Sequence, residues 1–426
     1  MARIVLNTFG SFGDLHPFLA IALELQRRGH QPILAAPAFY RDKVSAEGIE
    51  FAAVRPDIGK LREQPEIIRK LWDRRRGTEF LIREMLAPQM EGAFEDLRRA
   101  CQGANLLVTH TAGFAGPIVA ETLHLRWLSV ALQPSVFFST FDPPVLAPAE
   151  WLSHLRPLGR WPFILAREYG RFETRKWLRP VVELRRQLGL AAKTHPLFEG
   201  QFSPYGTLAL FSSHFVQPQP DWPPKVTITG FVFYDKLGSG FEIQGKATDV
   251  ALDEFLAAGA PPLVFTLGSS AVMHPGSFFR ESAAAAAEIG RRAVLLAGEQ
   301  YRNQIPPNPP NWIFVAQYAP YSKLLPRAAV TVHQGGIGTT AQALAAGRPM
   351  LAVPWAHDQP DNAAVLERLG VSLTVSRQRY RTPLVAKTLS RVLKDPVFAT
   401  TAQRLGTLIR NENGAAVASD AIEDAI

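Results

Sequence analysis

The sequence predicts an α/β protein built from two doubly wound parallel-sheet lobes, and three observations support that prediction. The chain has 426 residues, which is too long for a single hydrophobic core of ordinary size. Short apolar runs alternate with amphipathic helical segments in both halves, and a stretch rich in proline and glycine separates them at residues 217–240. The expected organisation is a first lobe at 1–220, a connection at 221–248, a second lobe at 249–395 and a C-terminal helix at 396–426 that packs back on the first lobe.

Strand, helix and strand follow one another within about thirty residues at the start of the first lobe, which is the pattern of a βαβ unit. A glycine turn, Gly10-Ser11-Phe12-Gly13-Asp14, connects the first strand to the first helix. Periodicity predicts, in order, a strand at 3–7, a helix opened by Pro17 and ended by Gly29, strands at 31–35 and 106–109, a helix at 116–123 and a strand at 127–131.

The second lobe repeats this alternation after the connection. Each lobe is therefore expected to form its own doubly wound sheet. The predicted strands of the second lobe lie at 263–267, 293–297, 312–315, 329–332 and 350–353, with a helix at 279–289, a helix through 341–345 and terminal helices from residue 382 onward.

Composition excludes several classes of protein. Hydrophobic residues make up 47% and charged residues 20% of the chain, as in ordinary globular domains, which argues against a disordered chain. No window holds the roughly 18 consecutive apolar residues that span a bilayer, and no signal-peptide core is seen, so a cytoplasmic protein is expected. Cys101 is the only cysteine, which excludes an intramolecular disulfide and a cysteine-rich zinc site.

The positive charge is concentrated in one segment. The formal net charge is +8, and residues 151–187 hold nine Lys or Arg against three acids. Such a segment suits an anionic membrane surface or a nucleic acid, or it forms an ordinary solvated helical face. Because no nucleic-acid-binding motif accompanies it, no nucleic-acid partner is expected. Its aromatic residues favour peripheral contact with the inner face of a membrane.

The second lobe carries a glycine-rich loop between a strand and a helix, His333-Gln334-Gly335-Gly336-Ile337-Gly338-Thr339-Thr340. Glycines let a ligand approach the backbone, and the N–H groups at the following helix N-terminus suit a phosphate or diphosphate. His333, Thr339 and Thr340 offer further donors on that side. The loop lacks the Gly-Lys-Ser/Thr of a Walker loop and the spacing of the dinucleotide fingerprint, which disfavours kinase and dehydrogenase functions. A loop needed only for packing is the alternative.

Two acidic positions stand out beside strand ends. Asp358 and Gln359 follow the strand at 350–353 and can bracket the vicinal hydroxyls of a sugar. In the first lobe, Asp14 lies at the strand-to-helix turn, with His16 two residues on. A carboxylate at this turn is able to accept a proton from an incoming hydroxyl or to cap the helix, and the residues alone leave both roles open.

These motifs resemble the nucleotide-sugar-dependent glycosyltransferases of the UDP-glycosyltransferase superfamily over nearly the whole chain. The N-terminal turn is similar to the bacterial and sterol-glycosylating branch, including rhamnosyltransferase B-like and macrolide enzymes. The resemblance implies the GT-B fold, in which two Rossmann-like lobes face a central cleft. The segments that carry it are Tyr318-Ala319-Pro320, Leu324-Leu325-Pro326, residues 333–340, Ala346-Gly347-Arg348-Pro349, Asp358-Gln359 and residues 10–17.

The resemblance also implies a donor site in the second lobe. Tyr318 matches an aromatic residue that stacks on the nucleobase, His333 matches the diphosphate-binding histidine, and Ser269 matches a phosphate-loop serine. Gln342 stands where plant relatives use a glutamate for the ribose hydroxyls. The implied donor-binding residues are Ser269, Tyr318, His333, Gly335, Gly336, Gly338, Thr339, Gln342, Asp358 and Gln359.

For the reaction, the resemblance implies an inverting transfer from a UDP- or dTDP-sugar, which is a co-substrate. Asp14 stands where plant enzymes have a catalytic histidine and is expected to deprotonate the acceptor hydroxyl, with His16 beside it. No metal and no cofactor are expected, because there is no Asp-x-Asp motif and because the helix N-terminus and His333 can stabilise the leaving nucleotide diphosphate.

Acceptor recognition is expected in the first lobe. Aromatic segments at 134–141 and 151–163 suit a pocket for a small lipophilic acceptor, either a lipid or an aglycone, although core packing explains each residue equally well. The candidate acceptor-contacting residues are His110, Phe137 and Phe138. A nucleotide-sugar epimerase and a catalytically weak auxiliary protein are the alternative functions, and the presence of Asp14 and Asp358-Gln359 argues against both.

Overall fold

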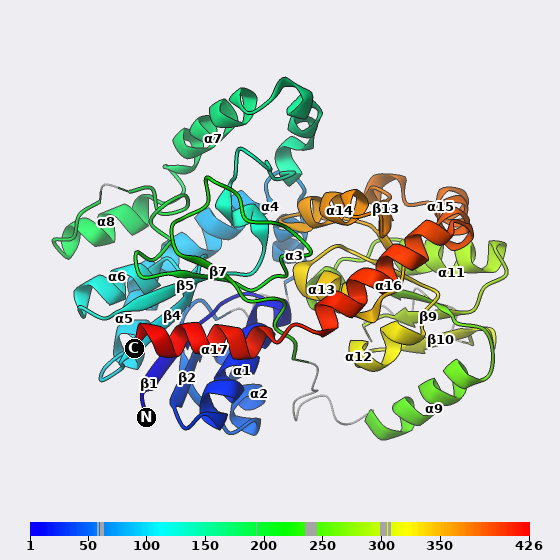
Figure 1. Ribbon diagram of the computed structural model, residues 1–426, viewed down its shortest axis with the longest axis horizontal. Helices are drawn as coiled ribbons and strands as arrows, with labels where there is room; N and C mark the ends of the chain where they lie inside the picture. The colour runs from blue at the N-terminus through cyan, green and yellow to red at the C-terminus, as the bar shows by residue number, and fades with distance from the viewer. Residues whose placement is uncertain (58, 60–63, 193, 235–244, 299–304, 306–307) are drawn as a thin grey trace. The chain divides into compact units, whose positions relative to one another are not determined.

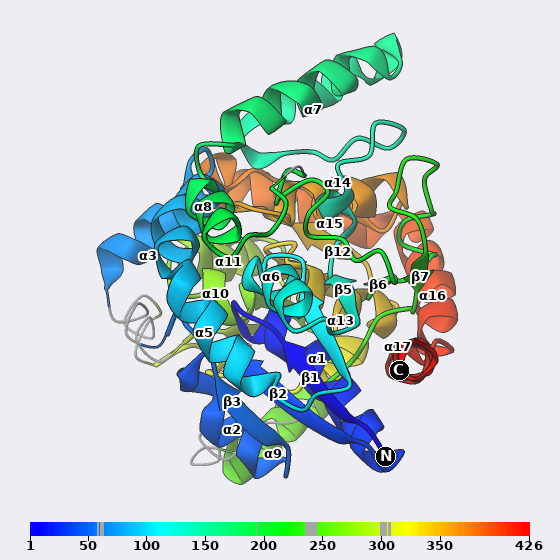
Figure 2. The same cartoon turned by 90° about the vertical axis from the view of Figure 1, so that its left-hand side faces the viewer.

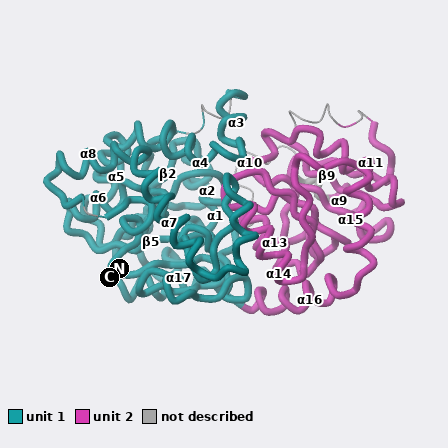
Figure 3. Tube along the Cα trace, turned by 90° about the horizontal axis from the view of Figure 1, so that it is seen from above, with its two compact units in different colours: residues 1–234, 412–426 teal, residues 235–411 magenta. Residues whose placement is uncertain are grey.

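The computed structural model describes residues 1–426 apart from 58, 60–63, 193, 235–244, 299–304, 306 and 307. The chain divides into two compact units, residues 1–234 with 412–426 (unit 1) and residues 235–411 (unit 2), as Figure 3 shows. Unit 1 thus extends beyond the predicted limit at residue 220, because a last strand at Val226–Ile228 pairs with the first sheet. Part of the predicted connection, 235–244, lies outside the described residues.

Unit 1 is built on a sheet of seven parallel strands in the order β3-β2-β1-β4-β5-β6-β7 (Figure 1). The strand order reverses between β1 and β4, and ligands bind outside the carboxyl ends of the strands at such a point. The strands are β1 (Arg3–Asn7), β2 (Gln31–Ala36), β3 (Glu50–Ala53), β4 (Leu106–His110), β5 (Trp127–Ala131), β6 (Thr207–Ala209) and β7 (Val226–Ile228).

Helices of unit 1 pack against this sheet and bury its central strands. Strand β4 is buried at all five positions, as expected for a central strand that is covered on both faces. The α-helices are α1 (Phe12–Arg27), α2 (Arg41–Ala46), α3 (Pro65–Leu71), α4 (Gly77–Phe80), α5 (Met90–Ala100), α6 (Ala115–Thr122), α7 (Trp161–Thr174), α8 (Arg179–Gln187) and α17 (Gly414–Ala425). The other helical segments are 3-10 helices at Ala38–Tyr40, Ala87–Gln89, Pro134–Phe137 and Ala147–Leu158, and a π-helix at Leu81–Leu86.

Unit 2 has a sheet of six parallel strands in the order β10-β9-β8-β11-β12-β13, which reverses between β8 and β11. The predicted fold class, two doubly wound parallel α/β lobes, is therefore confirmed. The strands are β8 (Leu263–Thr266), β9 (Ala293–Leu296), β10 (Ile313–Ala316), β11 (Val330–His333), β12 (Met350–Ala352) and β13 (Ser372–Thr374). The helices are α9 (Gly245–Ala257), α10 (Gly268–Ala271), α11 (Phe278–Glu288), α12 (Tyr321–Leu324), α13 (Ile337–Ala346), α14 (Gln359–Arg368), α15 (Thr382–Lys394) and α16 (Pro396–Arg410), with 3-10 turns at Leu325–Arg327 and Arg377–Arg379.

The prediction that Pro17 opens the first helix is wrong. Helix α1 begins at Phe12, and Pro17 lies inside it. Ser11 is the N-cap: its Oγ accepts a hydrogen bond from the Gly13 backbone N–H (3.1 Å), and its own N–H donates to the Asp14 carboxylate (2.6 Å). This reciprocal capping box satisfies N–H groups at the helix start, so Asp14 lies in the first turn of α1 rather than ahead of it.

The C-terminal segment forms two helices where one was predicted. Helix α16 packs against α13 in unit 2, whereas α17 packs against α1 in unit 1. The last helix of the chain therefore packs on the first unit, as predicted, but it is α17 alone and not the whole of 396–426 that does so. None of the helices in the described part of the chain is long and apolar enough to cross a bilayer.

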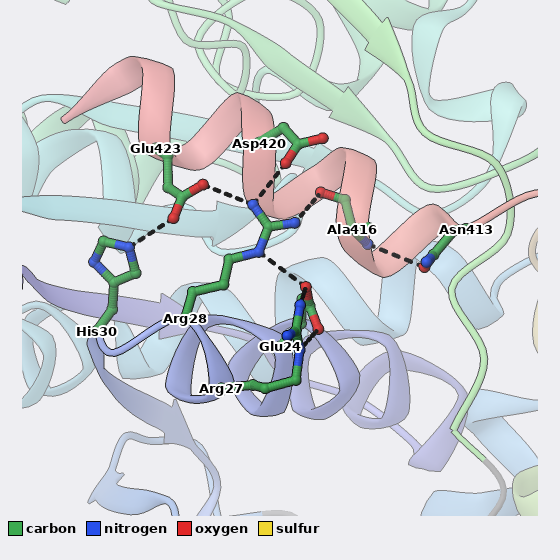
Figure 4. Close-up of polar contacts among 8 residues, drawn as sticks. All are labelled: Glu24, Arg27, Arg28, His30, Asn413, Ala416, Asp420 and Glu423. Carbon is green, nitrogen blue, oxygen red and sulfur yellow. Dashed lines mark hydrogen bonds and ion pairs between the residues drawn. The ribbon is translucent and has the colours of Figure 1, made fainter.

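Arg28, at the C-terminal end of α1, joins α1 to α17 (Figure 4). Its guanidinium donates to Asp420 Oδ1 and to Glu423 Oε2, both at 2.6 Å, and to the carbonyl of Ala416 at 3.1 Å. A further bond runs from Arg28 Nε to Glu24 Oε1 at 2.9 Å, within the same helix. Only 17% of the Arg28 side chain is exposed, so the network is shielded more than an ordinary surface pair.

Replacement of Arg28 by alanine is expected to loosen α17. Loss of the charge-assisted bonds should cost about 1–2 kcal/mol locally, which corresponds to roughly tenfold faster amide hydrogen exchange in α17. Arg27→Ala is the matched control, because Arg27 is 71% exposed and pairs with Glu24 of its own helix. Equal exchange rates in α17 for the two variants would contradict this role of Arg28.

Candidate active site

Asp14 lies in the first turn of α1, the helix that begins at Phe12 after β1 ends at Asn7, at the carboxyl edge of the unit 1 sheet. The half-buried carboxylate uses one oxygen for capping: Oδ2 accepts from the Ser11 backbone N–H at 2.6 Å and from Ser11 Oγ at 3.0 Å. Among the described residues, nothing donates to the other oxygen, Oδ1. Capping and proton transfer are therefore compatible, because they involve different oxygens of one carboxylate.

The surroundings of Asp14 strengthen it as a base. Burial raises the pKa of Asp14 to about 6, and the hydrogen bonds from Ser11 oppose that rise without cancelling it. The carboxylate is thus mostly ionised at neutral pH and yet binds a proton more strongly than an ordinary aspartate. Gly10 lets the Asp14 carboxylate approach the backbone of the turn closely. It has a φ of +116°, and a Cβ there would collide with Asp14 Oδ2.

His16 packs among aromatic rings. Its ring centroid lies 5.3 Å from that of Phe12 and 5.0 Å from that of Tyr234. Burial, together with the positive charge of Lys43, lowers the pKa of His16 to about 3, so the ring is neutral at physiological pH. Residues two positions apart on a helix lie on different faces, so the side chains of His16 and Asp14 point in different directions. Its catalytic role stays a prediction.

His110 is the last residue of β4, directly beside the point where the strand order reverses. Its Nδ1 accepts from the backbone N–H of Ala112 at 3.0 Å, which places the ring proton on Nε2. Burial lowers the pKa of His110 to about 4, so the ring is a neutral donor at pH 7. Nε2 is buried and has no hydrogen-bond partner among the described residues, and it is thus able to donate to an acceptor molecule.

The two phenylalanines predicted to meet the acceptor have different surroundings. Phe137 is only 6% exposed, and its ring stacks on Trp222 at a centroid distance of 4.4 Å and on Phe202 at 5.5 Å. This packing accounts for its burial. Phe138 is half-buried, has a φ of 47° and lies 4.5 Å from the ring of Phe198. Contact of either ring with an acceptor stays a prediction.

In unit 2, His333 ends β11 as His110 ends β4 in unit 1, and each strand lies at the reversal point of its sheet. His333 Nδ1 accepts from the Gly335 backbone N–H at 3.1 Å, so Nε2 carries the proton. Nε2 is buried without a partner among the described residues, and burial lowers the pKa of His333 to about 4. His333 therefore offers one neutral N–H donor at the carboxyl edge of the sheet.

The N-terminus of α13 lies in the same loop and supplies backbone donors. Its N-cap, Gly336, has no side chain to satisfy the first N–H groups, so those of the first turn are available to an anion. Gly338 and Thr339 lie in this turn, and Thr339 Oγ1 accepts from Gln334 Nε2 at 3.3 Å. Thr340 Oγ1 is buried without a partner in the described part of the chain. Together these groups present several hydrogen-bond donors in one loop, as the predicted phosphate site requires.

Asp358 and Gln359 lie at the start of α14, the helix that follows β12. Gln359 Oε1 accepts from the backbone N–H of Trp355 at 2.8 Å, which commits this oxygen to the loop and leaves the amide Nε2 to donate. Asn362 donates through Nδ2 to Asp358 Oδ2 at 2.6 Å and to the Gly335 carbonyl at 2.9 Å. Asn362 thus links the loop at 358–359, predicted to bind the sugar, to the loop at 333–340, predicted to bind phosphate.

The remaining predicted donor residues lie on neighbouring strand ends. Ser269 follows β8, and the adjoining Gly268, with a φ of +64°, leaves room for Gln334 and Thr339, because a Cβ there would collide with the Gln334 amide. Gln342 is half-buried on α13. Tyr318 follows β10, which is the edge strand of the sheet, and is the predicted donor residue placed furthest from β11 in strand order.

Two buried polar residues of the site were not singled out from the sequence. Gln334 carries a buried Oε1, and Asn362 a buried Oδ1, without partners among the described residues. The spacing of Asn362, four positions after Asp358 on one helix, was the available signal. In the described ranges, no group of three or more His, Cys, Asp or Glu side chains is arranged to hold a metal ion.

Known proteins resemble this chain in both halves. The model of the Glycosyltransferase family 28 N-terminal domain matches residues 4–96, and that of the Erythromycin biosynthesis protein CIII-like C-terminal domain matches residues 280–421. The O-mycaminosyltylonolide 6-deoxyallosyltransferase of Streptomyces fradiae is 33% identical, over 99% of this chain and 97% of that protein. The sterol 3-beta-glucosyltransferase of Leptosphaeria maculans is 28% identical over 98% of this chain, which spans only 28% of that longer protein.

Solved structures share the architecture. The calicheamicin glycosyltransferase CalG4 matches with a TM-score of 0.73 and 20% sequence identity, over 100% of this chain and 98% of that one. The spinosyn rhamnosyltransferase SpnG, complexed with thymidine diphosphate, matches with a TM-score of 0.68 and 18% identity, over 99% of both chains. At these identities the likeness concerns the fold.

Proposed function

The chain belongs to the nucleotide-sugar-dependent glycosyltransferases of the GT-B fold, and from this premise we propose an inverting, metal-independent transfer to a lipophilic acceptor with Asp14 as general base. The donor is a UDP- or dTDP-sugar, and the acceptor is a small lipid or aglycone that carries a hydroxyl group. The observation that carries the proposal is the Asp14 carboxylate, which has one oxygen without a donor and a pKa raised to about 6.

The chemistry assigns separate tasks to the two units. Asp14 Oδ1 takes the proton of the acceptor hydroxyl while the acceptor oxygen forms its bond to the anomeric carbon of the sugar. The bond from that carbon to the diphosphate oxygen breaks, and its electron pair leaves with the nucleotide diphosphate. His333 Nε2–H and the N–H groups of the α13 N-terminus stabilise this leaving charge without a metal ion.

The sugar is held by the loop at the start of α14. Asp358 is an acceptor and the free amide of Gln359 a donor, which suits two neighbouring hydroxyls. Asn362 sets the spacing between this loop and the phosphate loop through its bonds to Asp358 and to the Gly335 carbonyl. Tyr318 is assigned to the nucleobase, and Gln342 to the ribose.

The acceptor class follows from the relatives and from unit 1. The Streptomyces fradiae relative is named for a macrolide acceptor and the Leptosphaeria maculans relative for a sterol, and both are lipophilic molecules with hydroxyl groups. His110 supplies a neutral N–H donor near the switch point of the unit 1 sheet, where such a hydroxyl is expected. Peripheral contact with a membrane is part of the proposal, because lipophilic acceptors partition into bilayers and unit 1 carries basic and aromatic residues.

The proposal is tested by a transfer assay in EDTA. The purified protein is incubated with a panel of UDP- and dTDP-sugars and with macrolide and sterol acceptors, and products are identified by mass spectrometry and by the anomeric coupling constant in proton NMR. We expect a glycoside of inverted configuration without added metal. A retained configuration, or a product that forms only when Mg or Mn is added, would contradict the mechanism. An auxiliary protein would be favoured if neither a glycoside nor donor breakdown were observed, because an intact transferase releases some free nucleotide diphosphate even without an acceptor.

The pH dependence of kcat/KM reports the ionisation of Asp14 in the free enzyme. Because only the ionised carboxylate accepts a proton and its pKa is raised to about 6, kcat/KM should fall about tenfold per pH unit below pH 6. Donor affinity should stay constant from pH 8 down to about 5, because His333, with a pKa of about 4, is neutral throughout that range. A plateau of kcat/KM that extends down to pH 4.5 would remove Asp14 as the base.

A further inference from the structure

Helix α7 and the 3-10 segment before it expose an unusual number of large apolar side chains. Helix α7 lies at the periphery of unit 1, away from the sheet of that unit, in both views of Figures 1 and 2. We call the exposed set the α7 stripe; it comprises Trp151 (63% exposed), Leu158 (55%), Trp161 (59%), Leu165 (60%), Tyr169 (67%) and Phe172 (68%). Soluble surfaces seldom gather so many large apolar side chains on two consecutive elements, which points to a partner for the stripe.

The stripe follows the geometry of an amphipathic helix. Trp161, Leu165 and Phe172 are spaced by four and seven residues, so their side chains lie on one face of α7. The opposite side of the helix attaches it to unit 1 through Phe163 and Thr174, both buried. Unit 1 therefore occupies one face of α7 and leaves the aromatic face outward.

Basic side chains border the stripe at both ends of α7. Arg160 is exposed ahead of the helix, and its guanidinium lies 3.4 Å from the ring centroid of Phe141. Arg175 follows the helix, is exposed, and has no acidic partner in the described part of the chain. Residues 160–176 carry five Lys or Arg and two acids, which gives a local charge of +3.

Acids in and around the helix pair with several of its cations. Glu168 contacts Arg171 at 3.3 Å and Arg167 at 3.8 Å, and Arg167 also lies 3.8 Å from Asp221. Glu199 pairs with Arg171 as well. Beyond the helix, Lys176 pairs with Glu173 at 2.7 Å. Arg160 donates to Thr140 Oγ1 at 2.9 Å, but neither Arg160 nor Arg175 has an acidic partner in the described part of the chain, so their charges are the ones left for an anionic surface.

We propose that the α7 stripe docks unit 1 on the surface of an anionic lipid bilayer. The stripe has the composition of an interfacial helix, with tryptophan, tyrosine and phenylalanine beside arginine. In such a helix the aromatic rings enter the boundary between headgroups and acyl chains, and the cations contact lipid phosphates. The arginines at the two ends of α7, Arg160 and Arg175, distinguish this surface from a purely apolar one. The inference rests on the membrane contact included in the proposed function and names the surface that makes it. It requires neither donor nor acceptor, so a failure of vesicle binding is distinguishable from a failure of sugar transfer.

Flotation of the full chain with vesicles tests the proposal. The probes are vesicles of phosphatidylethanolamine with phosphatidylglycerol, and vesicles of phosphatidylcholine alone. We expect the protein to float with the anionic vesicles and much less with the neutral ones. The triple variant Trp161→Ser, Leu165→Ser, Phe172→Ser should bind the anionic vesicles at least tenfold more weakly. Tyr205→Ser and Val397→Ser, which change residues 50% and 60% exposed outside the stripe, are the matched controls and should bind normally.

A charge variant separates the electrostatic contribution. Arg160→Glu with Arg175→Glu should reduce binding to anionic vesicles severalfold and leave the residual binding to neutral vesicles unchanged. Circular dichroism checks that each variant is folded, and brominated lipids should quench tryptophan fluorescence of the wild-type protein, a readout that needs no variant. Absence of binding and of quenching, or equal binding by the triple variant, would overturn the proposal. A concentration-dependent dimer that the triple variant abolishes, without vesicle binding, would instead assign the stripe to a second copy of the chain.

Discussion

Replacing Asp14 with asparagine is expected to lower the rate of sugar transfer by about a thousandfold, the usual contribution of a general base. Asparagine has the same shape, and its carbonyl oxygen can accept the hydrogen bonds that Ser11 now gives to Oδ2. An NH₂ group then occupies the position of Oδ1, which cannot accept a proton. The substitution therefore removes the base and keeps the cap, which single-turnover kinetics with a saturating donor would measure directly.

The donor site provides the control for this variant. Donor affinity of Asp14→Asn should stay within twofold of the wild-type value, because the groups assigned to the diphosphate lie in unit 2. Ser11→Ala should weaken the helix start by about 1 kcal/mol and leave turnover mostly intact, because it removes a capping group and not the base. Near-normal turnover of Asp14→Asn would assign the proton transfer to another residue.

Replacing His333 with alanine is expected to weaken binding of the nucleotide diphosphate by about 10- to 100-fold. A hydrogen bond to a charged group is worth about 1.5–3 kcal/mol, and the Nε2–H of His333 is a buried donor at the phosphate loop. The substitution also deprives the Gly335 N–H of its acceptor, which adds to the loss. Calorimetric titration of the variant with UDP and with dTDP gives the change in dissociation constant.

Two comparisons keep this result specific. Affinity for uridine or thymidine, which lack phosphate, should not change in His333→Ala, because the lost donor is the one assigned to the diphosphate. His154→Ala, which changes an exposed histidine in unit 1, should bind both ligands normally. Unchanged diphosphate affinity in His333→Ala would place the phosphate site elsewhere.

The central strands of both sheets could be predicted from the sequence, because strands buried on both faces read as continuous apolar runs. The prediction at 3–7 matches β1, and the prediction at 106–109 misses only the last residue of β4, His110. The outer strands β6 and β7 are three residues each, too short for a pattern to stand out. Proline at position 17 suggested a helix start, whereas the capping box at Ser11 determines it.

Part of the candidate site could also be predicted from the sequence, because polar and glycine residues directly after a buried strand lie at the carboxyl edge of the sheet. This places Asp14 and His333 at the reversal points of the two sheets. Asn362 depends on a bond between separate loops, from its Nδ2 to the Gly335 carbonyl, which no local pattern encodes. Gln334 bonds within its own loop, to Thr339 Oγ1, and this bond requires the folded turn. The division of the Asp14 carboxylate into a capping oxygen and a free one likewise requires the folded turn.

The most direct test of the account is a calorimetric titration of the wild-type protein with UDP and dTDP, each followed by its sugars, in the presence of EDTA. The account predicts that binding occurs without any divalent cation, ranks one nucleotide above the other, and persists in Asp14→Asn. Binding that appears only after Mg or Mn is added would contradict the assignment of the leaving charge to His333 and the α13 N-terminus.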